Sequence, residues 1–110
     1  MGQIVFYEGN GGSQNIVHTI DDSPGQDFHL RQNDEARSVK LLNVRQGCFI
    51  EVFDHPEGQR SDDFCVIEVR RSSSEYTVNT FERSYDDEYV IVSYANNNGL
   101  DGKVSRVRVN

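Results

Sequence analysis

The sequence predicts an all-β fold built as a β-sandwich. Short runs of β-branched and aromatic residues recur along the chain, and clusters of Gly, Asn, Asp and Ser separate them. No window of about a dozen residues keeps apolar side chains at the i, i+3, i+4 and i+7 spacing of an amphipathic helix. Many short strands separated by turn-forming residues are typical of two packed sheets that each bury one face.

Each expected strand is a run rich in Val, Ile, Tyr, Phe or Thr that ends at a turn-forming cluster. In chain order the strands are 3–7 (QIVFY), 15–20 (NIVHTI), 27–30 (DFHL), 38–44 (SVKLLNV), 48–54 (CFIEVFD), 63–69 (DFCVIEV), 75–82 (EYTVNTFE), 88–95 (EYVIVSYA) and 103–109 (KVSRVRV). The turn segments between them are EGNGGSQ, DDSPGQ, VRQGC, DHPEGQRSDD, RRSSS, ERSYDD and NNNGLDG.

The composition limits what the chain can bind. Its 110 residues suffice for a single domain, 1–110, that buries most of its apolar surface without a disulfide framework or a structural metal. The formal net charge of −7 and the isoelectric point near 4.8 argue against a nucleic-acid-binding protein, which needs a basic face to displace counterions. No stretch approaches the roughly 20 apolar residues of a membrane helix. We therefore expect a soluble monomer, whose compartment the sequence does not identify.

The two cysteines, Cys48 and Cys65, are too few for a disulfide framework and lack the CxxC spacing of a zinc site. Both stand in apolar runs, so we expect reduced thiols packed in the core. A hairpin centred between Pro56 and Glu57 would place the two residues opposite each other, which leaves a cross-strand disulfide as an alternative.

The polar residues do not form a recognisable catalytic motif. His18, His29 and His55 do not stand in a metal-binding spacing, and no G-x-S-x-G elbow supports a Ser-His-Asp triad. We therefore do not expect an enzyme. Acidic clusters flank several strands, where they act as solvated ends that discourage edge pairing, and the last cluster is an alternative weak cation site. These clusters are Asp21-Asp22, Asp62-Asp63 and Asp86-Asp87-Glu88.

The chain contains an internal repeat. The segment 7–12 (YEGNGG) aligns with 53–58 (FDHPEG): each has an aromatic residue, an acid and a four-residue turn closed by glycine. A second pattern precedes the last strand of each half, where 33–41 aligns with 101–109. The halves are therefore about 1–44 and 45–110, and the second contains extra residues around 70–95 that can form one more hairpin. Each half alone has too few strands to cover an apolar face.

An aromatic-acid-glycine hairpin followed by an N/D-N/D-x-x-S/T-S signature resembles the βγ-crystallin superfamily, in particular its microbial calcium-binding members. The signatures here are NDEARS (33–38) and DGKVSR (101–106). The resemblance covers nearly the whole chain and implies two Greek-key motifs in one domain. It also implies a sandwich of two four-stranded sheets, in which the motifs exchange a strand across a pseudo-twofold axis. The additional hairpin belongs to the second motif.

The resemblance implies that each calcium ion is held by both motifs. Its ligands would be a hairpin carbonyl, the side chain at position 2 of one signature, and the position-3 carbonyl and position-5 hydroxyl of the other. One such set contains the Glu8 carbonyl, Asp34, the Lys103 carbonyl and Ser105, and it supplies every required oxygen. Oxygens of these kinds are the ligands that calcium prefers.

The second set contains the Asp54 carbonyl, Gly102, the Glu35 carbonyl and Arg37. Gly102 offers no side-chain oxygen, and Arg37 offers a cation. A guanidinium about 5 Å from a divalent ion costs several kcal/mol even at an effective dielectric constant near 20. We expect this site to be disabled, because both departures from the signature fall on it.

The sequence thus predicts a non-enzymatic calcium-binding domain that takes one Ca²⁺ per chain at a modest Kd of about 10⁻⁵ to 10⁻³ M. The ion would stabilise the fold. One alternative is a calcium-independent structural or stress protein, because Asn-Asp and Asp-Gly are ordinary turn formers. Another is a secreted inhibitor or toxin module of the same fold, for which the exposed segment 82–88 (ERSYDDE) would be the acting loop.

Overall fold

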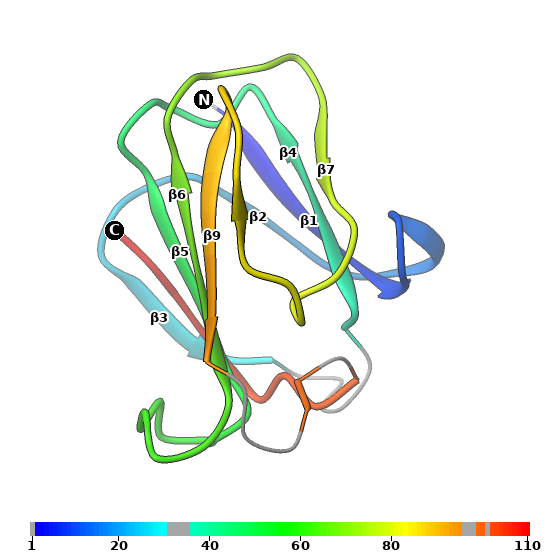
Figure 1. Cartoon of the computed structure of the whole chain (residues 1–110), viewed down its shortest axis with the longest axis vertical. Helices are drawn as coiled ribbons and strands as arrows, with labels where there is room; N and C mark the ends of the chain where they lie inside the picture. The colour runs from blue at the N-terminus through cyan, green and yellow to red at the C-terminus, as the bar shows by residue number, and fades with distance from the viewer. Residues whose placement is uncertain (1, 31–35, 96–98, 101) are drawn as a thin grey trace.

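Two antiparallel sheets pack face to face in a β-sandwich (Figure 1). The computed structural model describes residues 2–30, 36–95, 99–100 and 102–110. Within these residues there is no helix, and hence none long and apolar enough to cross a membrane. The prediction of an all-β sandwich is confirmed.

The strands form one sheet of four and one sheet of six. The first has the order β2-β1-β4-β7, and the second has the order β3-β10-β5-β6-β9-β8. Their bounds are β1 Gln3–Gly9, β2 Ser13–Asp21, β3 Gln26–His29, β4 Ser38–Leu42, β5 Phe49–Phe53, β6 Phe64–Val69, β7 Tyr76–Val78, β8 Tyr85–Asp86, β9 Val90–Ala95 and β10 Arg106–Val109.

The two halves of the chain each give one strand to the other's sheet. Strand β3 of the first half pairs with β10, beside β5 and β6 of the second half. Strand β7 of the second half pairs with β4, beside β1 and β2 of the first half. Neither sheet is complete without the opposite half, so the halves fold as one domain.

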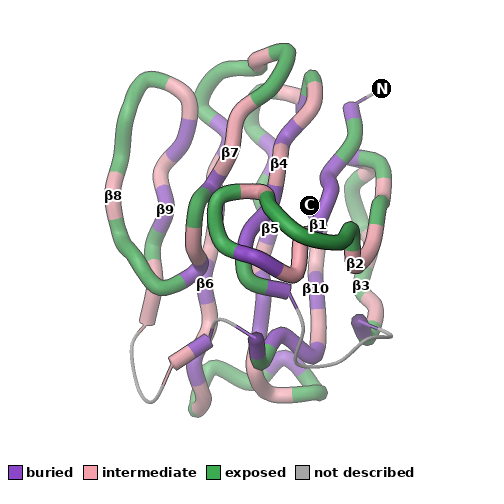
Figure 2. The backbone as a smooth tube through the Cα atoms, turned by 90° about the vertical axis from the view of Figure 1, so that its right-hand side faces the viewer, coloured by how far each residue is buried: buried purple, intermediate pink, exposed green. Residues whose placement is uncertain are grey.

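The core lies between the sheets, and buried positions alternate along β6 and β10 (Figure 2). In β6, Cys65, Ile67 and Val69 are buried while the residues between them are only partly covered. This period of two is the pattern that places one face of a strand on a core. At the centre, the rings of Phe6 and Phe81 lie 6.5 Å apart between centroids, and both are fully buried.

All nine expected strands contain a strand of the structure, but the sequence missed a tenth. Strand β8 is two residues long and lies in the segment ERSYDD, which reads as a turn. It pairs with β9 through Tyr85 opposite Val92 and Asp86 opposite Ile91, so the additional hairpin is β8–β9. This hairpin extends the second sheet, which corrects the expected four strands to six.

The cysteines are free, buried thiols. Strands β5 and β6 pair with Cys65 opposite Val52, and the amide of Val69 donates to the carbonyl of Cys48 at 2.9 Å. A hairpin centred between Pro56 and Glu57 would place the two cysteines opposite each other. The connection between β5 and β6 is longer than that hairpin, so the two cysteines do not pair across the strands. Burial raises the pKa of the Cys48 thiol. The prediction of packed, reduced thiols is confirmed, and the disulfide alternative is wrong.

Thiol labelling checks this arrangement. We expect both thiols of the chain to react with an aromatic disulfide reagent in concentrated guanidinium chloride without prior reduction. In native buffer the reaction should be slow and limited by opening of the core, because both sulfurs are buried. Absence of free thiols in denaturant would contradict the structure, as would rapid labelling of the native protein.

Candidate functional site

The two repeated hairpins are built alike in the structure. Each closes on a glycine with a positive φ, +67° at Gly12 and +72° at Gly58. A Cβ at Gly12 would come within 2.5 Å of the Lys40 side chain, and one at Gly58 within 2.7 Å of the Arg108 guanidinium. The positive φ therefore favours glycine at both positions, whereas the neighbouring atoms belong to flexible side chains that can shift.

Equivalent backbone hydrogen bonds join each signature to a hairpin. The amide of Arg37, at position 5 of the first signature, donates to the carbonyl of Tyr7 at 2.8 Å. The amide of Ser105, at position 5 of the second signature, donates to the carbonyl of Phe53 at 2.8 Å. Each signature thus contacts the hairpin of its own half, and the two contacts are related by the repeat.

Three predicted site residues gather at the first hairpin. Arg37 donates from Nη1 to the carbonyl of Glu8 at 3.2 Å. A Cβ on Gly102 would lie 2.9 Å from Nη2 of Arg37, and the amide of Gly102 donates to the carbonyl of Ala36 at 2.9 Å. The two departures from the signature pattern, Arg37 and Gly102, are therefore neighbours in space.

This grouping revises the assignment of the hairpin carbonyls. The sequence placed Glu8 with Ser105 and Asp54 with Arg37, whereas the hydrogen bonds place Glu8 with Arg37 and bring Ser105 beside Phe53, the neighbour of Asp54. The physical reason is that each signature packs on the hairpin of its own half. Sequence spacing alone does not show which hairpin a signature contacts.

Two oxygen atoms of the second signature lie close together near the second hairpin. The hydroxyl of Ser105 donates to the carbonyl of Lys103 over a long 3.5 Å, and Ser105 is 7% exposed. Two oxygens that each lie about 2.4 Å from one calcium ion, with an oxygen–calcium–oxygen angle of about 90°, are about 3.4 Å apart. The Lys103 carbonyl and the Ser105 hydroxyl are thus spaced as adjacent calcium ligands. Asp34, Glu35 and the start of the second signature, Asp101, lie outside the described residues.

The sixth positions of the signatures anchor the hairpins in two different ways. Ser38 is fully buried, accepts a hydrogen bond from the amide of Gly12 at 2.9 Å and donates to the carbonyl of Gly9. Arg106 takes the equivalent place in the second half and donates to the carbonyl of Pro56 at 3.0 Å. The hydrogen bond from Arg106 to Asp27, at 2.7 Å, lowers the pKa of that carboxyl.

The acidic residue Asp63 has a structural role that the sequence did not suggest. It was expected at a solvated strand end, but it is fully buried. Its Oδ2 accepts hydrogen bonds from the Tyr94 hydroxyl at 2.6 Å and from the Gly99 amide at 2.7 Å. Asp63 therefore ties the approach to the second signature to β9, and a polar residue directly before a buried strand was the only available signal.

Among the described residues, no three Asp, Glu, His or Cys side chains gather as they would around a metal ion. The side chains of the acidic cluster at 86–88 instead form ion pairs and a hydrogen bond with other residues of the protein. Asp86 pairs with Arg70 at 3.7 Å, Glu88 pairs with Arg71 at 2.8 Å, and Asp87 accepts the hydroxyl hydrogen of Tyr76 at 2.6 Å. The one acidic side chain that the sequence assigns to the intact site, Asp34, lies outside the described residues.

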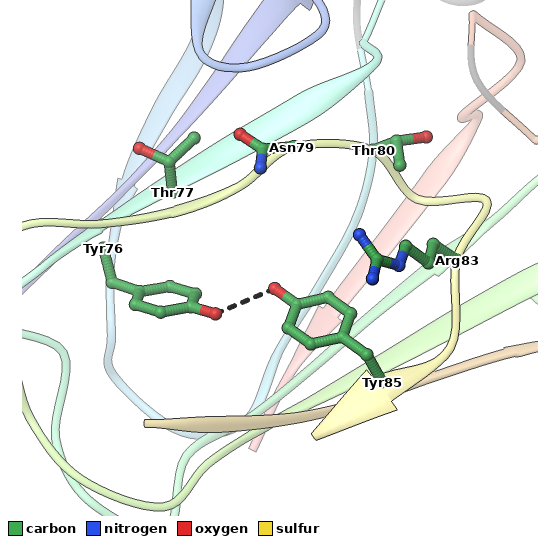
Figure 3. Close-up of a pocket in the computed structure, with 6 residues that line it drawn as sticks. All are labelled: Tyr76, Thr77, Asn79, Thr80, Arg83 and Tyr85. Atoms are coloured by element: carbon green, nitrogen blue, oxygen red, sulfur yellow. Dashed lines mark hydrogen bonds between the residues drawn. The ribbon is translucent and has the colours of Figure 1, made fainter. Parts of the chain in front are cut away.

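A pocket of about 290 Å³ opens between β7 of one sheet and β8 of the other (Figure 3). The sequence analysis did not anticipate it, because its two walls come from different sheets. It is lined by Tyr76, Thr77, Asn79, Thr80, Arg83 and Tyr85.

Tyr76 connects the two walls of this pocket. Its hydroxyl lies 2.9 Å from that of Tyr85, and its ring centroid lies 5.6 Å from that of Tyr89. Burial, and next the hydrogen bond to Asp87, raise the pKa of Tyr76 far above its usual range. Burial raises the pKa of Asp87, but hydrogen bonds from Tyr76 and from the amides of Val90 and Tyr89 outweigh it, and the net pKa is lowered. The β8–β9 hairpin is therefore fixed to the opposite sheet.

Comparisons with protein-family models, with curated proteins and with solved structures found no match.

Removing the Tyr76 hydroxyl tests this connection. We expect Tyr76→Phe to lower the free energy of unfolding by about 1 kcal/mol at pH 7, since Asp87 is exposed and its hydrogen bonds are partly screened. A carboxyl with a lowered pKa stabilises the fold above its unfolded pKa, and this contribution is lost as the pH falls through the folded pKa. The deficit of the variant should therefore shrink below about pH 4.

Urea unfolding at pH 7 and pH 3 measures both effects. Tyr89→Phe is the matched control, because the Tyr89 hydroxyl makes no hydrogen bond to a described residue while its ring packs on Tyr76. Equal losses in the two variants, or a Tyr76→Phe deficit that does not depend on pH, would show that the hydroxyl does not stabilise the hairpin.

Proposed function

We propose that the protein is a non-enzymatic calcium-binding domain of the βγ-crystallin type, which binds one ion at the second hairpin. The observation that carries this proposal is the convergence of the Lys103 carbonyl and the Ser105 hydroxyl beside the hairpin that contains Asp54. The ligand set becomes the Asp54 carbonyl, the Lys103 carbonyl, the Ser105 hydroxyl and, from the first signature, the side chain of Asp34.

The strand order supports the same family. When β8 and β9 are set aside, each sheet places the first, second and fourth strands of one half beside the third strand of the other half, which is the exchange that the resemblance implies. The β8–β9 hairpin adds to one edge without disturbing this order. The equivalent hydrogen bonds of Arg37 and Ser105 to the two hairpins support the pseudo-twofold relation between the halves.

The two ends of the repeat differ in how well they fit an ion. At the second hairpin the donors are neutral oxygens that calcium accepts. At the first hairpin the Arg37 guanidinium already donates to the Glu8 carbonyl, and Gly102 contributes no ligand. An ion there would face a cation and lack a side-chain oxygen. The proposal therefore assigns one ion to the chain, with a modest Kd of about 10⁻⁵ to 10⁻³ M.

A calcium-independent structural role is the second candidate, and a specific observation favours it. The loops are held by protein contacts that need no metal: Ser38 anchors the first hairpin, Arg106 the second, and Asp63 the segment before the second signature. Such a domain would be equally stable with calcium and with a chelator. The alternative of an inhibitory loop at 82–88 is less well supported, because strand β8 lies within this segment and pairs with β9.

Calcium titration distinguishes these candidates. At calcium about 100-fold above Kd, the folded state gains about 2.7 kcal/mol, which raises the Tm by roughly 10 °C in a domain of this size. We expect Ser105→Ala to lose this rise, because it removes a ligand oxygen. Thermal melts with calcium and with chelator, together with calorimetric titration, provide the measurements.

Ser38→Ala is the matched control for this experiment. It removes a buried hydroxyl from the other signature, which the proposal assigns to hairpin anchoring. It should lower the Tm in chelator but keep the full rise on adding calcium. If wild type binds no ion at millimolar calcium, or if Ser105→Ala binds as tightly as wild type, the proposed site is wrong.

The disabled site offers a gain-of-function prediction. We expect the double variant Arg37→Ser, Gly102→Asp to bind a second ion, because it restores a hydroxyl at position 5 and a carboxylate at position 2 of the signatures. Aspartate tolerates the positive φ of +77° at Gly102 better than most residues do. Calorimetric stoichiometry measures the result, and Arg37→Ser alone is the control that should remain at one ion. Unchanged stoichiometry in the double variant would refute the grouping of Arg37 with Gly102.

A further inference from the structure

The pocket between β7 and β8 exists because of the additional hairpin. One wall is β7 and the residues after it, from Tyr76 to Thr80, and the other wall is Arg83 and Tyr85 at the start of the hairpin (Figure 3). The first half of the chain has no equivalent hairpin, so the repeat does not explain the pocket. It is separate from the residues assigned to calcium.

Arg83 is distinctive among the arginines that the structure describes. Seven of the eight donate to a carboxylate or a backbone carbonyl, whereas Arg83 makes neither contact to a described residue. Those seven are Arg37, Arg45, Arg60, Arg70, Arg71, Arg106 and Arg108. The guanidinium of Arg83 instead lies 5.4 Å from the ring centroid of Tyr85. In a chain with 18 acidic residues, a cation without a carboxylate that lines a pocket is a candidate for ligand binding.

The remaining lining groups are neutral and suit a polar ligand. Asn79 brings an amide whose nitrogen points into the pocket, and the phenol rings of Tyr76 and Tyr85 bring apolar surface (Figure 3). The hydroxyls of Thr77 and Thr80 point away from Arg83, and that of Thr80 accepts a hydrogen bond from the amide of Glu82 at 3.1 Å. The two phenol hydroxyls are held 2.9 Å apart, and Tyr76 is also bonded to Asp87, so the rings are fixed before a ligand arrives. A volume of about 290 Å³ lies at the small end of ligand pockets.

We propose that this pocket binds a small, hydroxyl-rich ligand that carries one carboxylate, such as a sugar acid. The guanidinium of Arg83 would pair with the carboxylate in the two-pronged geometry that planar carboxylates and guanidinium groups share. The Asn79 amide would meet hydroxyls, and the tyrosine rings would cover the apolar face of the sugar ring. A single cation in an acidic protein does not suit a polyanion such as nucleic acid, which requires several.

Three small probes test the contributions of the sugar ring and of the carboxylate separately. Glucuronate carries both the ring and the carboxylate, glucose carries the ring alone, and acetate carries the carboxylate alone. Chemical-shift titration of the ¹⁵N-labelled protein in the presence of chelator measures each Kd and locates the binding residues. We expect saturable shifts at 76–85, with glucuronate binding about tenfold or more tighter than either partial probe. Because calcium is absent, the outcome is independent of the proposed metal site.

Arg83→Gln tests the role of the guanidinium. The side chain is exposed and pairs with no carboxylate among the described residues, so the variant should fold normally, as a thermal melt will show. It should lose the preference for glucuronate over glucose. Arg60→Gln is the matched control: Arg60 also lies over a ring, 4.7 Å from the centroid of Phe64, but it pairs with Glu51 and does not line the pocket. That variant should bind as wild type does.

Several results would overturn the proposal. These are the absence of saturable shifts with glucuronate, shifts that map away from 76–85, and a glucuronate preference that survives in Arg83→Gln. Equal loss in Arg83→Gln and Arg60→Gln would also overturn it, because the effect would then reflect net charge rather than the pocket.

Discussion

The exchange of one strand between the two halves is the constraint on which the rest of the structure depends. Strand β3 completes the sheet of the second half, and β7 completes the sheet of the first. A half that kept its own third strand would have the same number of strands but would leave one apolar face uncovered. The exchange also brings the segments before β4 and β10 to a common region, where the Gly102 amide reaches the Ala36 carbonyl. The proposed ion site is thus a consequence of the topology, since its ligands come from both halves.

The same topology explains why each signature residue has a fixed task. In both halves position 5 donates its amide to the hairpin, through Arg37 in one half and Ser105 in the other. The side chain of Arg37 also reaches a hairpin carbonyl, that of Glu8. Position 6 then supports the hairpin itself. Ser38 does so with a buried hydroxyl, and Arg106 does so with a guanidinium that also binds Asp27. A serine and an arginine are interchangeable at this position because both donate to a carbonyl of the turn, although the arginine needs a carboxylate beside it.

The sequence predicted the strands and turns of this fold better than it predicted which segments contact one another. Runs of β-branched and aromatic residues between turn-forming clusters located nine strands, and the internal repeat located both hairpins. Strand β8 was missed because two residues pair with β9 inside a turn-like segment, which is too short to contain such a run. The sequence grouped Glu8 with Ser105 and Asp54 with Arg37, whereas the hydrogen bonds join Glu8 to Arg37 and Ser105 to Phe53, because spacing does not specify which hairpin a signature contacts. Asp63 and the pocket at Arg83 were invisible for a related reason: each depends on segments that are distant in the sequence.

The adjacency of Arg37 and Gly102 gives a physical reason for why the repeat departs from its signature at two positions. The missing side chain at Gly102 leaves the space in which the guanidinium of Arg37 lies, and a Cβ there would approach Nη2 to 2.9 Å. Arg37 in turn donates to the Glu8 carbonyl, which an ion would otherwise bind. Under the proposed function, a covalently attached cation would therefore take the place of a dissociable one at this hairpin. Any dependence of stability on calcium concentration would then come from the Ser105 end alone.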